Sequence, residues 1–339
     1  MSATHQPTSF RHVVVVGPGA IGCVLAVRLA LAPSRPHVTL LDHRADRAAR
    51  LSARPVVLHA AEGDLQARVP VRTAPEDPPD LVILATKAGA AIAAARAAAR
   101  WIGGAPLLAI QNGLGVVEAV AEALPRTAVV AGVLYQAANV VAEGEVCHVA
   151  NEPTFFGYLG RAPDALVARI AALLESAGLA ARVEEDLAPQ VWGKAIINAA
   201  LNPVAALAGV RNGEVASRLS LRALAQGIAD EGQAVADAEG VRLPYASAAE
   251  ATLETARRTA ENRCSMLQDL EAGRPTEIEF LNGELVRAGE RCGVATPANR
   301  AVATLLRQVS KGVHHKKVAT SMGATDCSSI GGADAHRTV

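Results

Sequence analysis

Short apolar runs alternate with alanine-rich stretches of helical periodicity in the first half of the chain. Five runs are continuously apolar, as strands buried on both faces of a parallel sheet are: 13–17, 37–42, 81–86, 106–112 and 127–134. Helical segments are expected between several of them, near residues 20–32, 44–53, 88–101 and 114–123. This alternation predicts a doubly wound α/β domain around a parallel sheet.

Beyond residue 185 the strand pattern nearly disappears and long helices are predicted. They lie near residues 187–208, 214–239, 249–272, 277–292 and 298–311. We therefore expect an N-terminal α/β domain over 1–185, a C-terminal all-α domain over 186–313, and a disordered tail over 314–339. Within the helical part, Pro203 should kink or end its helix, and Thr276 and Glu279 have the spacing of a capping box.

Composition and charge narrow the class of protein. The chain has 339 residues, half of them apolar, with 33 basic and 33 acidic side chains and no block of like charge. This balance argues against a nucleic-acid or membrane-surface partner, and the start of the chain has no apolar run of signal-peptide length. The five scattered cysteines have no metal-binding spacing and fit a reducing, cytoplasmic compartment, so no metal site is expected. An apolar helical domain is compatible with a homodimer.

A glycine-rich loop follows the first predicted strand and opens the first predicted helix. It has the G-x-G-x-x-G pattern, formed by Gly17, Pro18, Gly19, Ala20, Ile21 and Gly22. In this context the glycines allow a tight turn, close approach of the backbone to a pyrophosphate, and close packing of helix on strand. The loop predicts a dinucleotide site in a Rossmann-like domain.

Asp42 and Arg44, at the end of the second strand, argue for different dinucleotides. Asp42 is placed where an acid takes the ribose diol of NAD, whereas Arg44 could pair with the 2′-phosphate of NADP. A guanidinium is the better partner for phosphate, so we favour NADP as the cofactor. Because of Asp42, NAD remains the alternative cofactor. Lys87 follows the third strand at the edge where such sheets bind ligands.

The segment VWGKAIINAALNP, residues 191–203, contains the strongest candidate for chemistry. The chain has only five lysines among its 33 basic residues, and Lys194 is one of two in the body of the protein. Lys194, Asn198 and Asn202 are spaced to lie on one side of a helix, where they could bind a substrate with hydroxyl, carbonyl and carboxylate groups. The simpler alternative is that the lysine extends to water and that the two amides form a contact between helices. Glu277 is a second candidate.

With these residues the chain resembles the ketopantoate reductase (2-dehydropantoate 2-reductase) family, within the superfamily of 6-phosphogluconate-dehydrogenase-like C-terminal domains. The resemblance rests on GPGAIG, ATKA at Lys87, QNG at 111–113, K-x3-N-x3-NP at 194–203, and SMLQD with TEIEFLNG over 265–283. It implies NADPH-dependent reduction of ketopantoate to pantoate, a step of pantothenate and coenzyme A biosynthesis. In the site it implies, Lys194 is the general acid, Glu277 assists it and Asn112 lies beside the nicotinamide. Asn198, Asn202 and Ser265 would bind the substrate. Arg44 and Lys87 would lie near the 2′-phosphate.

The chemistry expected of Lys194 follows from its ammonium group. Hydride transfer to a carbonyl carbon produces an alkoxide, which a protonated lysine can stabilise and then protonate. An arginine could not readily give up that proton. Two alternatives remain: an NAD(P)-dependent reductase of another 2-oxo acid, and a dinucleotide-sensing protein without turnover, which would need neither Lys194 nor Glu277.

Overall fold

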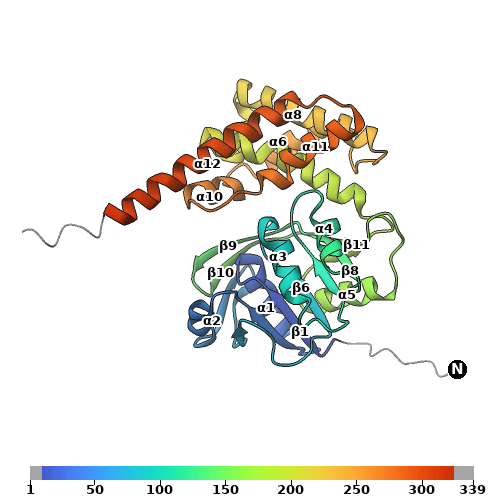
Figure 1. The fold of residues 1–339 in the computed structure, drawn as a ribbon, viewed down its shortest axis with the longest axis vertical. Coiled ribbons are helices and arrows are strands. Elements are labelled where there is room, and N and C mark those ends of the chain that lie inside the picture. The colour runs from blue at the N-terminus through green and yellow to red at the C-terminus, as the bar shows by residue number, and fades with distance from the viewer. Residues whose placement is uncertain (1–9, 324–339) are drawn as a thin grey trace, which may run out of the picture.

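The computed structural model describes residues 10–323, with side chains described to residue 311. Figure 1 shows an α/β part built around a twisted sheet and, beside it, a part made of helices alone. The fold class predicted from the sequence, a Rossmann-like domain followed by an all-α domain, is therefore confirmed.

The main sheet has eight strands in the order β12-β11-β8-β7-β6-β1-β2-β5. The six strands from β8 to β5 are mutually parallel, and β11 joins β8 antiparallel. Chain order reverses at β1, since β2 lies on one side of it and β6 on the other, and ligands bind at such switch points in doubly wound folds. The strands span His12–Val16 (β1), His37–Leu41 (β2), Val71–Arg72 (β5), Leu81–Leu84 (β6), Leu107–Ala109 (β7), Val129–Val133 (β8), Thr154–Gly157 (β11) and Ala181–Val183 (β12).

Helices cover both faces of this sheet. Alternate residues of β1 face opposite layers: Val13 and Val15 pack with α1 (Ala20–Leu31) and α5 (Ala165–Ser176), whereas Val14 packs with α3 (Ala88–Ala98) and α4 (Val116–Ala123). All three valines are fully buried. The continuous apolar runs of the sequence thus reflect strands buried on both faces.

A second sheet of four strands, in the order β4-β3-β10-β9, packs against α1 and was not predicted. Its strands are β3 (Val56–Ala60), β4 (Gly63–Ala67), β9 (Gln136–Ala142) and β10 (Glu145–Asn151). One face of this sheet is largely exposed, so the strands lack the continuous apolar pattern of the main sheet. The turn between β9 and β10 lies beside α2 (Ala45–Ser52), since a Cβ on Gly144 would lie 3.0 Å from the Leu51 side chain. Val57 N of β3 donates to the Gly144 carbonyl oxygen at 2.9 Å.

The helical part is built around α6 (Ala188–Ala208), which packs in a buried apolar cluster with several of the other helices. By length and composition α6 could cross a membrane, but 61% of its apolar window is buried, as in the core helix of a soluble domain. The remaining helices are α7 (Asn212–Ser217), α8 (Leu219–Ala238), α9 (Ala248–Arg258), α10 (Ser265–Glu271), the 3-10 turn η1 (Ile278–Phe280), α11 (Asn282–Cys292) and α12 (Pro297–Gly323).

Several local predictions for the helical part were wrong. The helix expected over 249–272 is two helices separated by an irregular segment. α6 continues to Ala208, close to its expected end, so Pro203 does not end this helix. Thr276 and Glu279 form no capping box: the Glu279 carboxylate accepts from Arg307 Nη2 at 2.9 Å, and α11 begins only at Asn282. Glu279 binds across the fold instead of within its own turn.

The tail predicted to be disordered from residue 314 is helical as far as Gly323, because α12 continues without a break. Lysine, alanine and methionine in this stretch favour helix even where no apolar periodicity is present. Residues 324–339 lie outside the described residues.

Two fully buried asparagines join three helices to α6. Asn282 Nδ2 donates to the Ala199 carbonyl oxygen of α6 and to Asn299 Oδ1, each at 2.9 Å. Asn299 Nδ2 in turn donates to Glu231 Oε2 on α8 at 2.8 Å. Because buried amides need partners, this network fixes the starts of α11 and α12 relative to the helix that contains Lys194.

We expect Asn299→Ala to lower the free energy of unfolding by about 2–4 kcal/mol, because it removes several buried hydrogen bonds and leaves a cavity. Urea denaturation of the variant and of Arg300→Ala, an exposed change at the next position of α12, provides the comparison. Equal stability of the two variants would contradict a structural role for the asparagine network.

Candidate active site

The carboxyl ends of five neighbouring parallel strands form one edge of the main sheet, facing the helical part. The glycine loop follows β1, Asp42 follows β2, Thr86 and Lys87 follow β6, Gln111 and Asn112 follow β7, and Leu134 follows β8. Polar residues therefore gather where open α/β sheets bind their ligands. α6 approaches the β7 and β8 end of this edge.

The glycine loop has the shape that a bound anion requires. Gly17 has a φ of 107°, and a side chain at Gly22 would overlap the Gly17 carbonyl oxygen. A Cβ placed at Gly19, by contrast, meets no described atom within 4 Å. The first turn of α1 contains no acidic residue, and among the described residues no side chain caps it. These residues fit the pyrophosphate of a dinucleotide, whose charge the free N–H groups would face.

Lys194 extends from α6 to the ends of two strands. Its Nζ donates to Asn112 Oδ1 at 2.7 Å and also to the Leu134 carbonyl oxygen. It lies 5.3 Å from the centre of the Tyr135 ring. Burial lowers the pKa of Lys194 from 10.5 to about 8, although the charge of Glu277 opposes this shift. Lys194 is thus a cation whose proton is available near neutral pH.

Glu277 is linked to Lys194 through Asn112. The carboxylate is only 8% exposed and accepts from Asn112 Nδ2 at 3.3 Å and from the backbone N–H of Ala88 at 3.1 Å. Asn112 therefore binds the ammonium with its oxygen and the carboxylate with its nitrogen. The structure brings together Lys194, Asn112 and Glu277, three residues that were singled out from separate segments.

The residue before Lys194 determines how closely the next loop approaches. A Cβ on Gly193 would lie 2.8 Å from Pro244, and the Tyr245 hydroxyl donates to the Gly193 carbonyl oxygen at 2.9 Å. Only glycine allows this contact, which holds α6 in place beside the lysine.

Asn198, Asn202 and Ser265 lie on elements that meet. Asn198 is half-buried and Asn202 is 8% exposed, both on α6, and Ser265 is exposed at the start of α10. The thiol of Cys264, next to Ser265, donates to the Asn202 carbonyl oxygen at 3.5 Å. Among the described residues, none of these three side chains has a hydrogen-bond partner, so their polar groups are available to a ligand.

Lys87 forms an ion pair with the helical part and does not lie beside Arg44, with which it was expected to share the 2′-phosphate. Its Nζ lies 2.7 Å from Asp269 Oδ2, and Arg274 Nε lies 2.9 Å from the other oxygen of this buried carboxylate. β1 separates the strands that precede Lys87 and Arg44, so their starting points are roughly 10 Å apart along the edge. The structure does not bring the two cations together.

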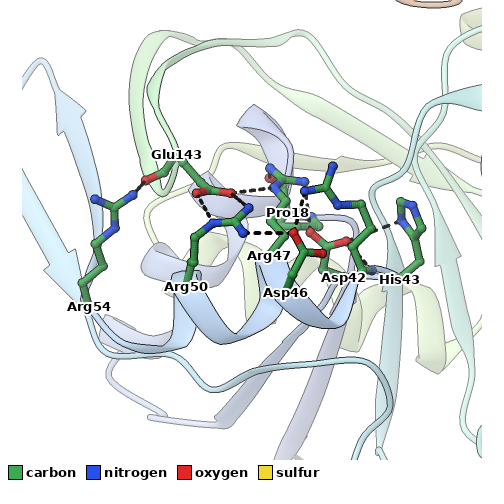
Figure 2. A network of polar contacts seen from close by, with 9 residues as sticks. Pro18, Asp42, His43, Asp46, Arg47, Arg50, Arg54 and Glu143 are labelled. Carbon is green, nitrogen blue, oxygen red and sulfur yellow. Dashed lines mark hydrogen bonds and ion pairs between the residues drawn. The ribbon is translucent and has the colours of Figure 1, made fainter. Parts of the chain in front are cut away.

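Arg44 belongs to a network of charges at the end of β2. Figure 2 shows Asp42, Asp46 and Arg47 of this network. The Arg44 guanidinium pairs with Asp46 Oδ2 at 3.0 Å, while its backbone N–H donates to Asp42 Oδ1 at 2.9 Å. Buried Asp42 also pairs with Arg47 Nη1 at 3.0 Å. Arg47 Nη2 donates to the Pro18 carbonyl oxygen at 3.0 Å, which joins this network to the glycine loop.

Sequence reasoning missed three parts of the site. Asp269 lies within the quoted SMLQD motif, but no role was assigned to it. The Leu134 carbonyl oxygen could not have been found, because a backbone acceptor leaves no signal in residue type. Glu143, which binds arginines of α2, comes from a surface turn far away in sequence.

Comparisons with known proteins identify the family of the chain. The family profile described as Ketopantoate reductase PanE/ApbA matches residues 13–161, and the one described as Ketopantoate reductase PanE/ApbA C terminal matches residues 186–310. A 2-dehydropantoate 2-reductase of Halobacterium salinarum is 34% identical over 87% of this chain and 97% of its own.

Solved structures show the same fold. A PanE/ApbA family ketopantoate reductase from Ralstonia eutropha JMP134 has a TM-score of 0.82 and 29% identity, covering 90% of this chain and 100% of its own. A D-mandelate dehydrogenase solved with NADH and anilino(oxo)acetate has a TM-score of 0.80 at 22% identity, covering 89% of this chain and 99% of its own. The second likeness concerns the fold alone.

We expect Glu277→Gln to lower the pKa of Lys194 below its value of about 8, because the negative charge that favours the ammonium is lost while burial remains. The pH dependence of Lys194 acetylation by acetic anhydride, followed by mass spectrometry, measures this. Glu279→Gln, two residues along and paired with Arg307, is the matched control. A Lys194 pKa that stays constant or rises in Glu277→Gln would refute the coupling.

Proposed function

The chain belongs to the ketopantoate reductase family, and on this premise we propose that it reduces ketopantoate to pantoate, with NADPH as the preferred cofactor. The observation that carries the proposal is the half-buried ammonium of Lys194, bound to Asn112 and the Leu134 carbonyl oxygen at the carboxyl edge of the sheet. It supplies a proton donor on the same sheet edge as the glycine loop, as reduction of a carbonyl by a bound dinucleotide requires.

In the proposed reaction Lys194 protonates the oxygen that becomes the hydroxyl of pantoate. The reduced nicotinamide, when bound, supplies the hydride to C2 of the 2-oxo acid. Lys194 Nζ then stabilises the negative charge that develops on the former carbonyl oxygen and transfers a proton to it, which completes the secondary alcohol. With a pKa of about 8, Lys194 is mostly protonated at pH 7.

Glu277 and Asn112 prepare the lysine for this step. The Glu277 charge favours the protonated amine against the effect of burial. Asn112 binds both groups, so it fixes where the ammonium points. We assign the general acid to Lys194, the supporting charge to Glu277 and the positioning of the ammonium to Asn112.

The substrate would be held by Asn198, Asn202 and Ser265. Their amide and hydroxyl groups can donate to a carboxylate and accept from a hydroxyl. They lie on α6 and at the start of α10, on the same helical part as Lys194. The loop from Gly17 to Gly22 would take the pyrophosphate. Arg44 would favour NADPH over NADH, whereas Lys87 pairs with Asp269 and would not share the 2′-phosphate with Arg44.

Reduction of another 2-oxo acid is the main alternative, because it needs the same loop and lysine but different pocket residues. A dinucleotide sensor without turnover is disfavoured, because it has no use for a lysine, amide and carboxylate held together. Steady-state NADPH oxidation with ketopantoate and a panel of other 2-oxo acids tests the proposal. Faster turnover of another 2-oxo acid would reassign the substrate, and no turnover with any of them would favour a sensor.

We expect Lys194→Ala to lower kcat about 10²–10⁴-fold, the usual contribution of a positioned acid, with little effect on cofactor affinity. Lys194→Arg should not restore activity, because a guanidinium keeps the charge but does not give up its proton. Stopped-flow and steady-state NADPH oxidation measure both variants beside Lys311→Ala, a control on α12. Recovery of most of kcat by arginine would reject proton donation, and near-normal kcat in alanine would remove Lys194 from the mechanism.

Arg44→Ala should raise the KM for NADPH about 10- to 150-fold and leave the KM for NADH nearly unchanged, because only NADPH has the 2′-phosphate that a guanidinium can pair with. Arg96→Ala, at the far end of α3 from Lys87, controls for loss of a surface charge. If the two KM values changed equally, Arg44 would not be the residue that selects the cofactor.

A further inference from the structure

The arginines of α2 are already occupied by a carboxylate from another part of the chain. Glu143 lies in the turn between β9 and β10, and Figure 2 shows its side chain directed at Arg47 and Arg50. Glu143 Oε2 lies 3.0 Å from Arg50 Nε, and Oε1 accepts from Arg50 Nη2 at 3.1 Å. Arg47 Nε lies 3.3 Å from the same Oε1.

This arrangement is the one that arginines offer to a phosphate group. Arg50 presents two parallel N–H groups to the carboxylate and Arg47 adds a third, the fork geometry that suits carboxylates and phosphates alike. The Arg50 guanidinium lowers the pKa of the Glu143 carboxyl, so Glu143 is an anion at neutral pH.

The backbone of the turn is held by the segment that follows α2 and by β3. Arg54 donates to the Glu143 carbonyl oxygen, and Val57 N donates to the Gly144 carbonyl oxygen at 2.9 Å. Gly144 has a φ of 79°, and a Cβ there would lie 3.0 Å from Leu51 of α2. The carboxylate therefore stays over the arginines through a fixed main chain. Its side chain is 31% exposed, so rotation of its own torsions can move it into solvent.

One of these arginines, Arg47, reaches the nucleotide end of the site. Arg47 bonds to both Asp42, at the end of β2, and the Pro18 carbonyl oxygen, in the glycine loop. In doubly wound folds the adenosine ribose lies between these two points. A 2′-phosphate on that ribose would pair with the guanidinium groups that now bind the Glu143 carboxylate.

We propose that Glu143 is a cofactor-specificity residue, whose carboxylate competes with the 2′-phosphate for Arg47 and Arg50 and so weakens binding of NADPH relative to NADH. The proposal rests on the proposed dinucleotide function. Glu143, which lies outside both the glycine loop and the end of β2, would thus set the affinity for NADPH relative to NADH.

Nucleotide binding tests the proposal without turnover. Adenosine 2′,5′-bisphosphate and adenosine 5′-monophosphate differ only in the 2′-phosphate, and isothermal titration calorimetry gives the Kd of each. We expect Glu143→Gln and Glu143→Ala to bind the bisphosphate about 3- to 10-fold more tightly than wild type, and the monophosphate equally well, because a partly exposed competing anion has been removed.

Two further variants isolate the cause. Glu145→Gln is the matched control on the same hairpin, because its carboxylate bonds to His59 Nε2 at 2.8 Å instead of to the arginines. In an Arg50→Ala background, Glu143→Gln should give a smaller gain, since one of the contested guanidinium groups is absent.

Unchanged or weaker binding of the bisphosphate would overturn the proposal, as would equal tightening of both nucleotides. If wild type bound neither nucleotide, the cofactor assignment would fall and this proposal with it. If both nucleotides bound but ketopantoate were not reduced, the proposed reaction would be wrong and the role of Glu143 would still be decided by the nucleotide affinities.

Discussion

The site depends on one half-buried positive charge. Removing a lysine ammonium from water is unfavourable unless oxygen atoms replace the lost solvent, and Lys194 finds them on Asn112 and in the Leu134 carbonyl group. These acceptors follow β7 and β8, whereas the lysine comes from α6. The interaction that positions the amine therefore also fixes the helical part against the edge of the sheet.

Other contacts between the two parts repeat this arrangement. The Glu277 carboxylate accepts from the N–H group that opens α3, and Asp269 binds Lys87 one residue earlier. Leu114 N donates to the Phe280 carbonyl oxygen at 2.8 Å, and Gly113, with a φ of 102°, lets the two backbones approach. Each contact begins just after a parallel strand. Residues that hold the parts together and residues that would carry out chemistry are therefore neighbours or identical, so substitutions here should affect stability and activity together.

The sequence predicted features that depend on local pattern. Strands buried on both faces appear as continuous apolar runs, and the glycine loop combines a strand, a turn and a helix in one short segment, so both could be recognised. The spacing of Lys194, Asn198 and Asn202 likewise indicates one face of a helix. The second sheet has one exposed face and weak alternation, and Glu279 pairs with Arg307 across the fold. Such features depend on long-range contacts, which no local pattern encodes.

The two ends of the site differ in how firmly the fold determines them. At Lys194 the partners include backbone groups and buried side chains, so their loss would leave uncompensated polar atoms and be strongly unfavourable. At α2 the arginines and acids are mostly half-exposed, and such ion pairs contribute little to stability. We therefore expect a change of charge there to alter which anion is bound without disturbing the strands beneath. On this view single substitutions at α2 would alter cofactor preference, whereas the proton chemistry proposed for Lys194 would depend on the contact between the two domains.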